Sequence, residues 1–292
     1  MIMRTMLLAG AAVLAATAAQ PANAANRLAS SLEWSFRHNN PDQADGAEIN
    51  AFDPGRNEIY VTGGKGVDVL DKAGNYLRTL RITDEGGAVA SVTVKNGVVA
   101  IAGQVGDAGR VRFFTTAGDF IRDVAVGTGP DSIAFTPDGK RLLVAIEGEP
   151  GEVVNPVGGI AVVDVASGSV NTLGFEGFEA QKTALQAKGA LFRPGTTFAE
   201  DIEPEFVAIS ADGKKAFVTL QENNLIAVVD LSGDTASIQE LIPAGLKDVS
   251  TAGNAFIHRR SAAIPTSEGL TGITALRQPD GIATFVYEGV TY

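Results

Sequence analysis

Hydrophobic and polar residues alternate along most of the chain in short runs that recur as a block. Alternation with a period of two is typical of β-strands with one buried face, and these runs are rich in Val, Ile and Phe. Four blocks align, and a fifth begins near the end of the chain. The blocks are Ala47–Leu80, Ser91–Val126, Asp131–Leu173, Glu205–Ile242 and the segment from Asp280. This repetition predicts an all-β protein built from one recurring unit.

Each block has the same order of strands and turns. A short strand comes first, followed by a polar turn that reads DPGRN, KNG, TPDGK or SADGK. Asn and Gly in such turns adopt the positive φ that a tight connection between antiparallel strands requires. A second strand, a third that ends in Asp or Thr, and a more polar fourth complete the unit. We therefore expect four-stranded antiparallel sheets.

The spacing of the blocks indicates the architecture. Their starts at residues 48, 91, 131, 205 and 280 are separated by 43, 40, 74 and 75 residues. The two short spacings match a propeller blade of about 40–45 residues, so residues 47–292 are expected to form a β-propeller with YVTN/WD40-like blades. A β-sandwich is the alternative, but it does not explain repetition at blade length.

The two longer spacings require insertions between blades. The first covers residues 176–204, where the stretch AQKTALQAKGALF predicts a helix. The second covers residues 243–279, where a polar, Gly-rich composition predicts a loop.

Four blocks and one further strand do not complete an ordinary ring of four to eight blades. We therefore expect a truncated propeller, or a fragment of a longer one, in which the last blade exposes an unpaired strand edge. In the preceding segment, residues 25–46, Leu32–Phe36 is a candidate closing strand for a C-terminal blade.

The first 24 residues have the pattern of a secretory leader. Arg4 is followed by an apolar run over Met6–Ala19, and Ala22-Asn23-Ala24 is an A-x-A cleavage site. The run is shorter than the roughly 20 apolar residues that span a bilayer, which favours cleavage over anchoring. No later segment is apolar and long enough to span. The expectation is export by a Sec-type leader to the periplasm, the exterior or the cell surface.

Composition narrows the range of chemistry. The chain has 23 Lys and Arg against 34 Asp and Glu, for a net charge of −11. An acidic protein lacks the basic surface that neutralises phosphates, so nucleic acid is excluded as a partner. With no Cys and two His, disulfides, thiolate metal sites and a Cys nucleophile are excluded.

Acidic residues recur at equivalent positions of the blocks. In a propeller, the segment before the first strand and the segment after the second strand open on the same side of each blade. A Pro-acid pair occurs before three first strands, at Pro130-Asp131, Pro204-Glu205 and Pro279-Asp280. The acids expected on this side are Glu48, Asp131, Glu147, Glu149, Glu203, Glu205, Glu222 and Asp280.

Carboxylates that point together repel one another unless a counter-charge lies between them. Ca²⁺ takes six to eight oxygen ligands. One interpretation is therefore a Ca²⁺ site formed by Asp131, Glu147, Glu149, Glu203, Glu205, Glu222 and Asp280. The alternative is a hydrated polar channel in which each acid caps a neighbouring backbone N–H. The chain has no D-x-D-x-D-G loop that would specify calcium. Asp131-Ser132 lacks the G-x-S-x-G elbow of a serine hydrolase, so a structural role is expected for Ser132.

Several blocks together resemble a known family. The stretches AEINAFDP, GPDSIAFTPDGKRLLVAIEGEP, DIEPEFVAISADGKKAFVTLQENNLIAVVDL and QPDGIATF are similar to the choice-of-anchor I domain over about Ala47 to Tyr292. The resemblance implies an exported bacterial propeller, related to the mesenchyme-specific cell surface glycoprotein type, whose members carry further blades and often a C-terminal surface anchor. Some relatives are labelled alkaline-phosphatase-like, although this sequence lacks the His and Asp pattern of true alkaline phosphatases.

Three functions follow from these observations. The first is a non-catalytic exported scaffold that binds a small ligand or a cell-surface component through the acids and the insertions. The second is a Ca²⁺-dependent phosphoesterase in which bound cations clamp a phosphate and activate water. The third is a degenerate fragment without a stable function. A phosphoesterase needs basic residues near the acids, and Lys65 and Arg277 are the only candidates that the sequence places there, so the scaffold is favoured.

Overall fold

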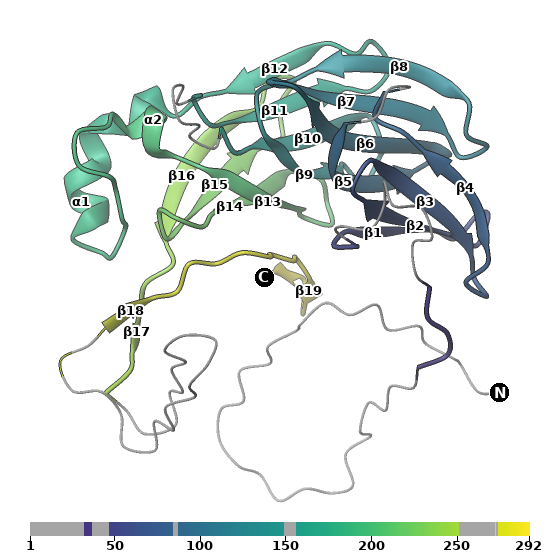
Figure 1. Ribbon diagram of the computed structural model, residues 1–292. Coiled ribbons are helices and arrows are strands. Elements are labelled where there is room, and N and C mark those ends of the chain that lie inside the picture. Colours follow the sequence, from purple (N-terminus) through teal and green to yellow (C-terminus); the bar gives the residue numbers. More distant parts are fainter. Residues whose placement is uncertain (1–31, 37–46, 84–86, 149–155, 251–271, 273) are drawn as a thin grey trace, which may run out of the picture. The chain divides into compact units, whose positions relative to one another are not determined.

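The computed structural model describes residues 32–36, 47–83, 87–148, 156–250, 272 and 274–292 (Figure 1). The chain divides into two units, residues 1–37 and 38–292. In the first unit the described residues Leu32–Phe36 have no regular secondary structure, so the closing strand expected there is not formed. The predicted leader and Glu149 lie outside the described residues.

Four sheets of four antiparallel strands make up most of the second unit, and in each sheet the strands lie in chain order. The first two sheets consist of β1 Asn50–Asp53, β2 Glu58–Gly63, β3 Gly66–Asp71 and β4 Tyr76–Leu80, then β5 Ala88–Lys95, β6 Val98–Val105, β7 Ala108–Thr115 and β8 Phe120–Ala125. The next two consist of β9 Pro130–Phe135, β10 Arg141–Ile146, β11 Gly159–Asp164 and β12 Val170–Leu173, then β13 Pro204–Ile209, β14 Lys215–Leu220, β15 Leu225–Asp230 and β16 Ser237–Pro243.

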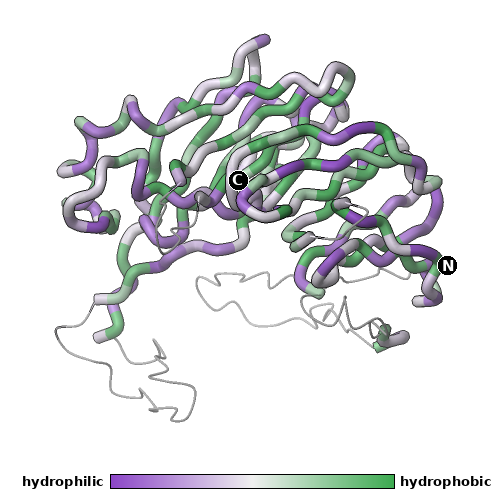
Figure 2. The backbone as a smooth tube through the Cα atoms, turned by 45° about the horizontal axis from the view of Figure 1, so that its top comes forward, coloured by the Kyte–Doolittle hydropathy of each residue, from purple (hydrophilic) through white to green (hydrophobic). Residues whose placement is uncertain are grey.

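The sheets are the blades of a β-propeller. The first strands of successive sheets contact one another, β1 with β5, β5 with β9 and β9 with β13 (Figure 1). Apolar side chains form clusters between neighbouring sheets; Tyr60 and Val69 of the first, for example, pack with Ile101 of the second. Figure 2 shows hydrophobic positions concentrated along the strands and hydrophilic positions at the connecting turns. The predicted all-β propeller fold is therefore confirmed.

Turn chemistry explains the tight connection between the first and second strands. In the third blade, the Thr136 hydroxyl donates to Asp138 Oδ1 at 2.7 Å and Gly139 has φ of 74°. In the fourth blade, the Ser210 hydroxyl donates to Asp212 Oδ1 at 2.7 Å and Gly213 has φ of 70°. Both turns place glycine where a side chain would strain the backbone.

Buried serines join the first strands of adjacent blades. The backbone N–H of Ile133 donates to Ser91 Oγ at 3.3 Å, and that of Val207 donates to Ser132 Oγ at 3.2 Å. Each bond satisfies a buried donor that the sheet ladder leaves unpaired. Ser132 therefore has the structural use expected of it.

The first insertion is less helical than the sequence suggests. It contains a 3₁₀ turn, η2 Glu176–Gln181, and two short helices, α1 Lys182–Gln186 and α2 Phe198–Asp201. An aromatic group holds it together, since the ring of Phe198 lies 6.2 Å from that of Phe178 and 4.9 Å from that of Phe192. The predicted helix is short because Gly189, with a φ of 97°, turns the chain soon after α1 ends.

The second insertion and the fifth block also differ from expectation. The predicted loop contains two paired strands, β17 Leu246–Asp248 and β18 Thr274–Leu276. From Asp280 the chain forms no first blade strand, and it ends in a hairpin of β19 Val286–Tyr287 and β20 Val290–Thr291. Glu288 and Gly289 have φ of 49° and 78°, which makes the two-residue reversal of a type I′ hairpin.

Candidate functional site

Irregular pairing places the recurring acids at the same end of each blade. In the third blade Ile133 pairs with Val144 and Pro130 with Ile146, so Asp131 and Ser132 together oppose one residue. The fourth blade has the same shift between Pro204 and Val207, at Glu205. Such β-bulges turn side chains out of the regular alternation and are frequent next to functional sites. Proline, which lacks an N–H, suits the start of each bulge.

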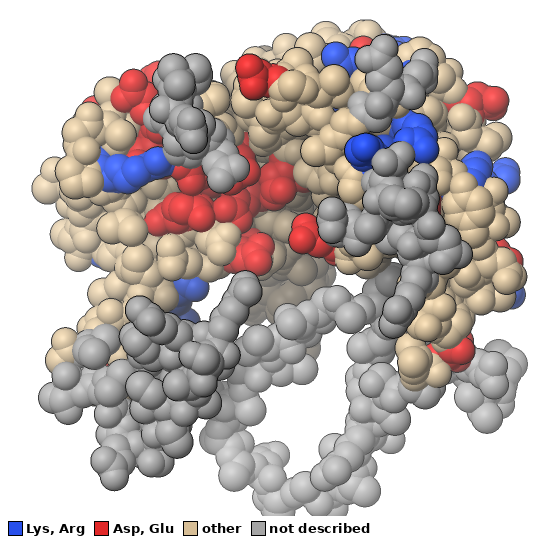
Figure 3. All heavy atoms as spheres, in the orientation of Figure 1, with Lys and Arg blue, Asp and Glu red and all other residues tan. Residues whose placement is uncertain are grey.

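The structure brings six of the predicted acids close enough for their charges to interact. We call this set the acidic rim: Glu48, Asp131, Glu147, Glu205, Glu222 and Asp280. The charges of Asp280 and Glu48 act on Asp131, and those of Glu222, Glu147 and Asp131 act on Glu205. Figure 3 shows Asp and Glu side chains gathered in a hollow of the surface.

Asp131 is less acidic than an ordinary aspartate. Its partial burial, together with the negative charges of Asp280 and Glu48, raises the pKa of Asp131 from 3.8 to about 6. Both causes disfavour the charged carboxylate. A cation placed beside Asp131 would relieve them.

Glu205 is the most perturbed member of the acidic rim. Burial, followed by a hydrogen bond with Glu222 and the charges of Glu222 and Glu147, raises the pKa of Glu205 to about 9. All of these causes favour the protonated form of Glu205 over its carboxylate. The Gln221 amide, oriented with its nitrogen toward Glu205, lies 3.1 Å and 2.5 Å from the two carboxyl oxygens.

Glu203 lies next to the acidic rim, since the charge of Glu222 also acts on it, but it has a basic partner of its own. It is buried and forms an ion pair with Arg193, whose Nε also donates to Asp201 at 2.6 Å. Burial raises the pKa of Glu203 and the charge of Arg193 opposes that rise. Arg193 was missed as a basic residue near the acids, where only Lys65 and Arg277 were expected, because it lies in the first insertion and no repeat marks it.

Two asparagines in the β14–β15 turn connect the insertions to the fourth blade. Asn223 accepts from the N–H of Glu203 at 3.2 Å and donates to the Asp201 carbonyl at 2.9 Å. Asn224 donates to the carbonyls of Gly189 and Gly245, and accepts from the N–H groups of Arg277 and Gln278, over 2.8–3.1 Å. The same turn thus positions Glu222 and the segment leading to Asp280.

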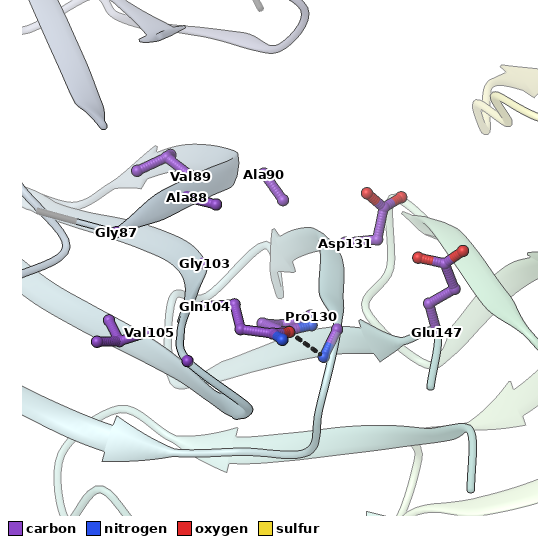
Figure 4. Close-up of a pocket in the computed structure, with 12 residues that line it drawn as sticks. Gly87, Ala88, Val89, Ala90, Gly103, Gln104, Val105, Pro130, Asp131 and Glu147 are labelled. Carbon is purple, nitrogen blue, oxygen red and sulfur yellow. Dashed lines mark hydrogen bonds between the residues drawn. The ribbon is translucent and has the colours of Figure 1, made fainter. Parts of the chain in front are cut away.

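A cavity of about 500 Å³ lies where β5 and β6 meet β9. Ala88, Val89 and Ala90 line one part of it, and Asp131 and Glu147 line another. Figure 4 shows the carboxylates of Asp131 and Glu147 side by side. The Gln104 side chain also lines the cavity, and its carbonyl oxygen accepts the N–H of Gly129 at 2.8 Å.

The geometry bears on the predicted Ca²⁺ site. Across the described part of the chain, no three Asp, Glu or His side chains are arranged to hold one metal ion. The acidic rim is a set of mutually repelling carboxylates rather than a preformed coordination shell. Calcium binding stays a prediction.

Comparisons with known proteins agree with this fold. The four blades make this protein a member of the β-propeller class. A family model for the choice-of-anchor I domain matches residues 48–292. The chain belongs to the choice-of-anchor I family. This membership supports an exported or cell-surface protein. Within the part that the structure describes, no helix is long and apolar enough to cross a membrane.

Solved structures with similar folds are distant. Hydrazine synthase from Kuenenia stuttgartiensis is 17% identical with a TM-score of 0.45, and covers 62% of this chain and 51% of its own. A functionally unknown protein from Desulfotomaculum acetoxidans is 13% identical (TM-score 0.46; 66% and 55%), and the Pan2 WD40 domain of Neurospora crassa is 16% identical (0.46; 70% and 55%). The chain spans about half the length of these structures. A search of curated proteins found no match.

Proposed function

We infer that this chain is an exported, non-catalytic propeller scaffold that binds a cationic ligand or a basic surface partner through the acidic rim. One observation carries the inference. Asp131 and Glu205 are drawn into partial burial, and the charges that act most strongly on both are those of other carboxylates. A bound cation removes that repulsion, whereas an anion increases it.

Thermal unfolding of the full chain tests this function. A cation that binds only the folded state raises the unfolding midpoint by mass action, by about 1.4 kcal/mol at ten times its dissociation constant. For a chain of this size that is a shift of roughly 3–5 °C. The screen uses CaCl₂, MgCl₂, small ammonium salts and a lysine-rich peptide at low ionic strength.

The matched variants are Asp131→Asn with Glu205→Gln, and Asp234→Asn as a control in an exposed turn. The double variant is expected to abolish the shift, and the control to keep it. If no cation gives a shift that depends on the acidic rim, the inference is wrong. Ca²⁺-dependent release of a chromogenic alcohol from a phosphate ester would replace the scaffold with the phosphoesterase.

A further inference from the structure

The cavity beside Asp131 has a size and lining that distinguish it from the rest of the acidic rim. Its volume of about 500 Å³ lies within the range of small-molecule sites, about 300–1,000 Å³. A bare metal ion would leave most of it to water. The cavity therefore fits an organic molecule better than an ion.

The blade repeat explains why the cavity exists at this point. The bulge of the second blade lies between Val89 and Ser91, so Ala90 is the residue equivalent to Asp131 and Glu205. Ser91 and Ser132 confirm the alignment, because each accepts the N–H of the next blade's first strand. Where other blades place a carboxylate, the second blade places a methyl group. The space left becomes the apolar part of the cavity wall.

A position at the end of the second strand also differs between blades. This position is Gln104 in the second blade, Glu147 in the third and Gln221 in the fourth. In each blade the residue before it pairs with an equivalent position of the first strand, namely Val89, Pro130 or Pro204. Gln221 faces the acid of its own blade. Gln104 has no such acid, and its carbonyl oxygen instead accepts the N–H of Gly129.

The lining is chemically two-sided. Asp131 and Glu147 offer carboxylate oxygens that accept charged N–H donors, and such bonds are among the strongest in proteins. Ala88, Val89 and Ala90 offer short apolar side chains to the remainder of a bound molecule. Calcium would need six to eight oxygens around it, which the apolar side of the cavity does not supply.

We propose that this cavity binds a small aliphatic amine, with the ammonium group between Asp131 and Glu147 and the aliphatic part against Ala88, Val89 and Ala90. The proposal rests on the proposed function, since it names the class of cation that the acidic rim takes. It also predicts that affinity falls below pH 6, because Asp131 then gains a proton and loses its charge.

Isothermal titration calorimetry of the full chain with n-butylamine hydrochloride at low ionic strength tests the proposal, with CaCl₂ titrated in parallel. Ala90→Leu fills the apolar side without changing charge, and Ala88→Leu does the same at an exposed position that tolerates the larger side chain. Ala117→Leu, in the exposed β7–β8 turn, is the matched control. Asp131→Asn removes the charge.

Binding is compared only for a cavity-filling variant that retains the unfolding midpoint of the native sequence. We expect that variant to weaken n-butylamine binding tenfold or more, Asp131→Asn to weaken it by a similar factor, and the control to leave it unchanged. An n-butylamine affinity unaffected by a folded cavity-filling variant would overturn the proposal. So would Ca²⁺ binding that depends on the acidic rim without any n-butylamine binding, which would leave the proposed function standing. Failure of both cations to bind would overturn the proposal, and the thermal-unfolding screen with the lysine-rich peptide would then decide the proposed function.

Discussion

Replacing Asp131 by Asn should stabilise the protein at alkaline pH and have no effect at acid pH. The folded state raises the pKa of Asp131 from 3.8 to about 6, so the folded protein holds a proton there more tightly than the unfolded chain. Stability contributed by this group is therefore greatest below pH 3.8, falls between pH 3.8 and 6, and is constant above pH 6. Because Asn cannot ionise, the variant does not lose this stability as the pH rises.

The magnitude follows from the shift. One pKa unit corresponds to about 1.4 kcal/mol. The ionised Asp131 therefore lowers the free energy of unfolding by at most ~3 kcal/mol above pH 6. Asp131 is only partly buried, and solvent screening of its charged neighbours reduces the expected gain to about 1–2 kcal/mol. The charge of Asp280 is one contributor, so Asp280→Asn should give part of the same gain.

Urea unfolding at pH 3.5, 5 and 8, in low salt and without added divalent cations, measures this difference. The free energy of unfolding of the variant should exceed that of the native sequence at pH 8, by roughly half of that amount or more at pH 5, and by no more than a few tenths of a kcal/mol at pH 3.5. Asp234→Asn, an exposed turn substitution, should be neutral at each pH. A variant that is less stable at pH 8, or equally changed at all three pH values, would show that Asp131 is not held among like charges.

Three further substitutions test the contacts that position the acidic rim, each by urea unfolding. Ser132→Ala should lower the free energy of unfolding by about 1–2 kcal/mol, because the buried N–H of Val207 loses its acceptor; no loss would mean that water replaces the hydroxyl. Asn224→Gly keeps the positive φ of 55° but removes four hydrogen bonds, and should cost roughly 2–4 kcal/mol; a loss below about 0.5 kcal/mol would contradict the clamp between the insertions. Arg193→Met should cost about 2–4 kcal/mol at pH 7 by leaving Glu203 buried and unpaired, and less at pH 4, where Glu203 is protonated; a deficit independent of pH would refute the ion pair.

Blade strands and turns were predictable because their signals are local. The strands follow from short runs rich in Val and Ile, although middle strands such as β10 and β11 are buried along both faces rather than alternately. Turns such as Thr136–Arg141 carry Asp and Gly at the positions that the hydrogen bonds require. The positions of the acids were also accessible, since a Pro-acid pair before a strand marks a bulge. The absence of an acid at Ala90 was equally visible in the sequence, but its consequence is a cavity, and a cavity depends on the neighbouring blade.

The insertions were harder because they are organised by contacts between distant segments. Arg193 reaches Asp201 and Glu203, and Asn224 reaches segments more than 50 residues away in the chain. One local signal was present: Thr197 and Glu200 form a capping box that starts α2, and the T-x-x-E spacing is a recognised helix start. The fifth block kept the sequence of a blade start, but residues 280–285 form no strand, so its pattern alone overstated its structure.

The bulges at Ala90, Asp131 and Glu205 separate recognition from folding. A bulged residue takes no place in the regular ladder, so its side chain is exchangeable without repacking the sheet behind it. Together with Glu48, these positions form a small surface whose side chains can vary while the backbone of the blades stays the same. Varying them should yield propellers of unchanged architecture with different ligand selectivity, which makes this rim a convenient starting point for engineered receptors.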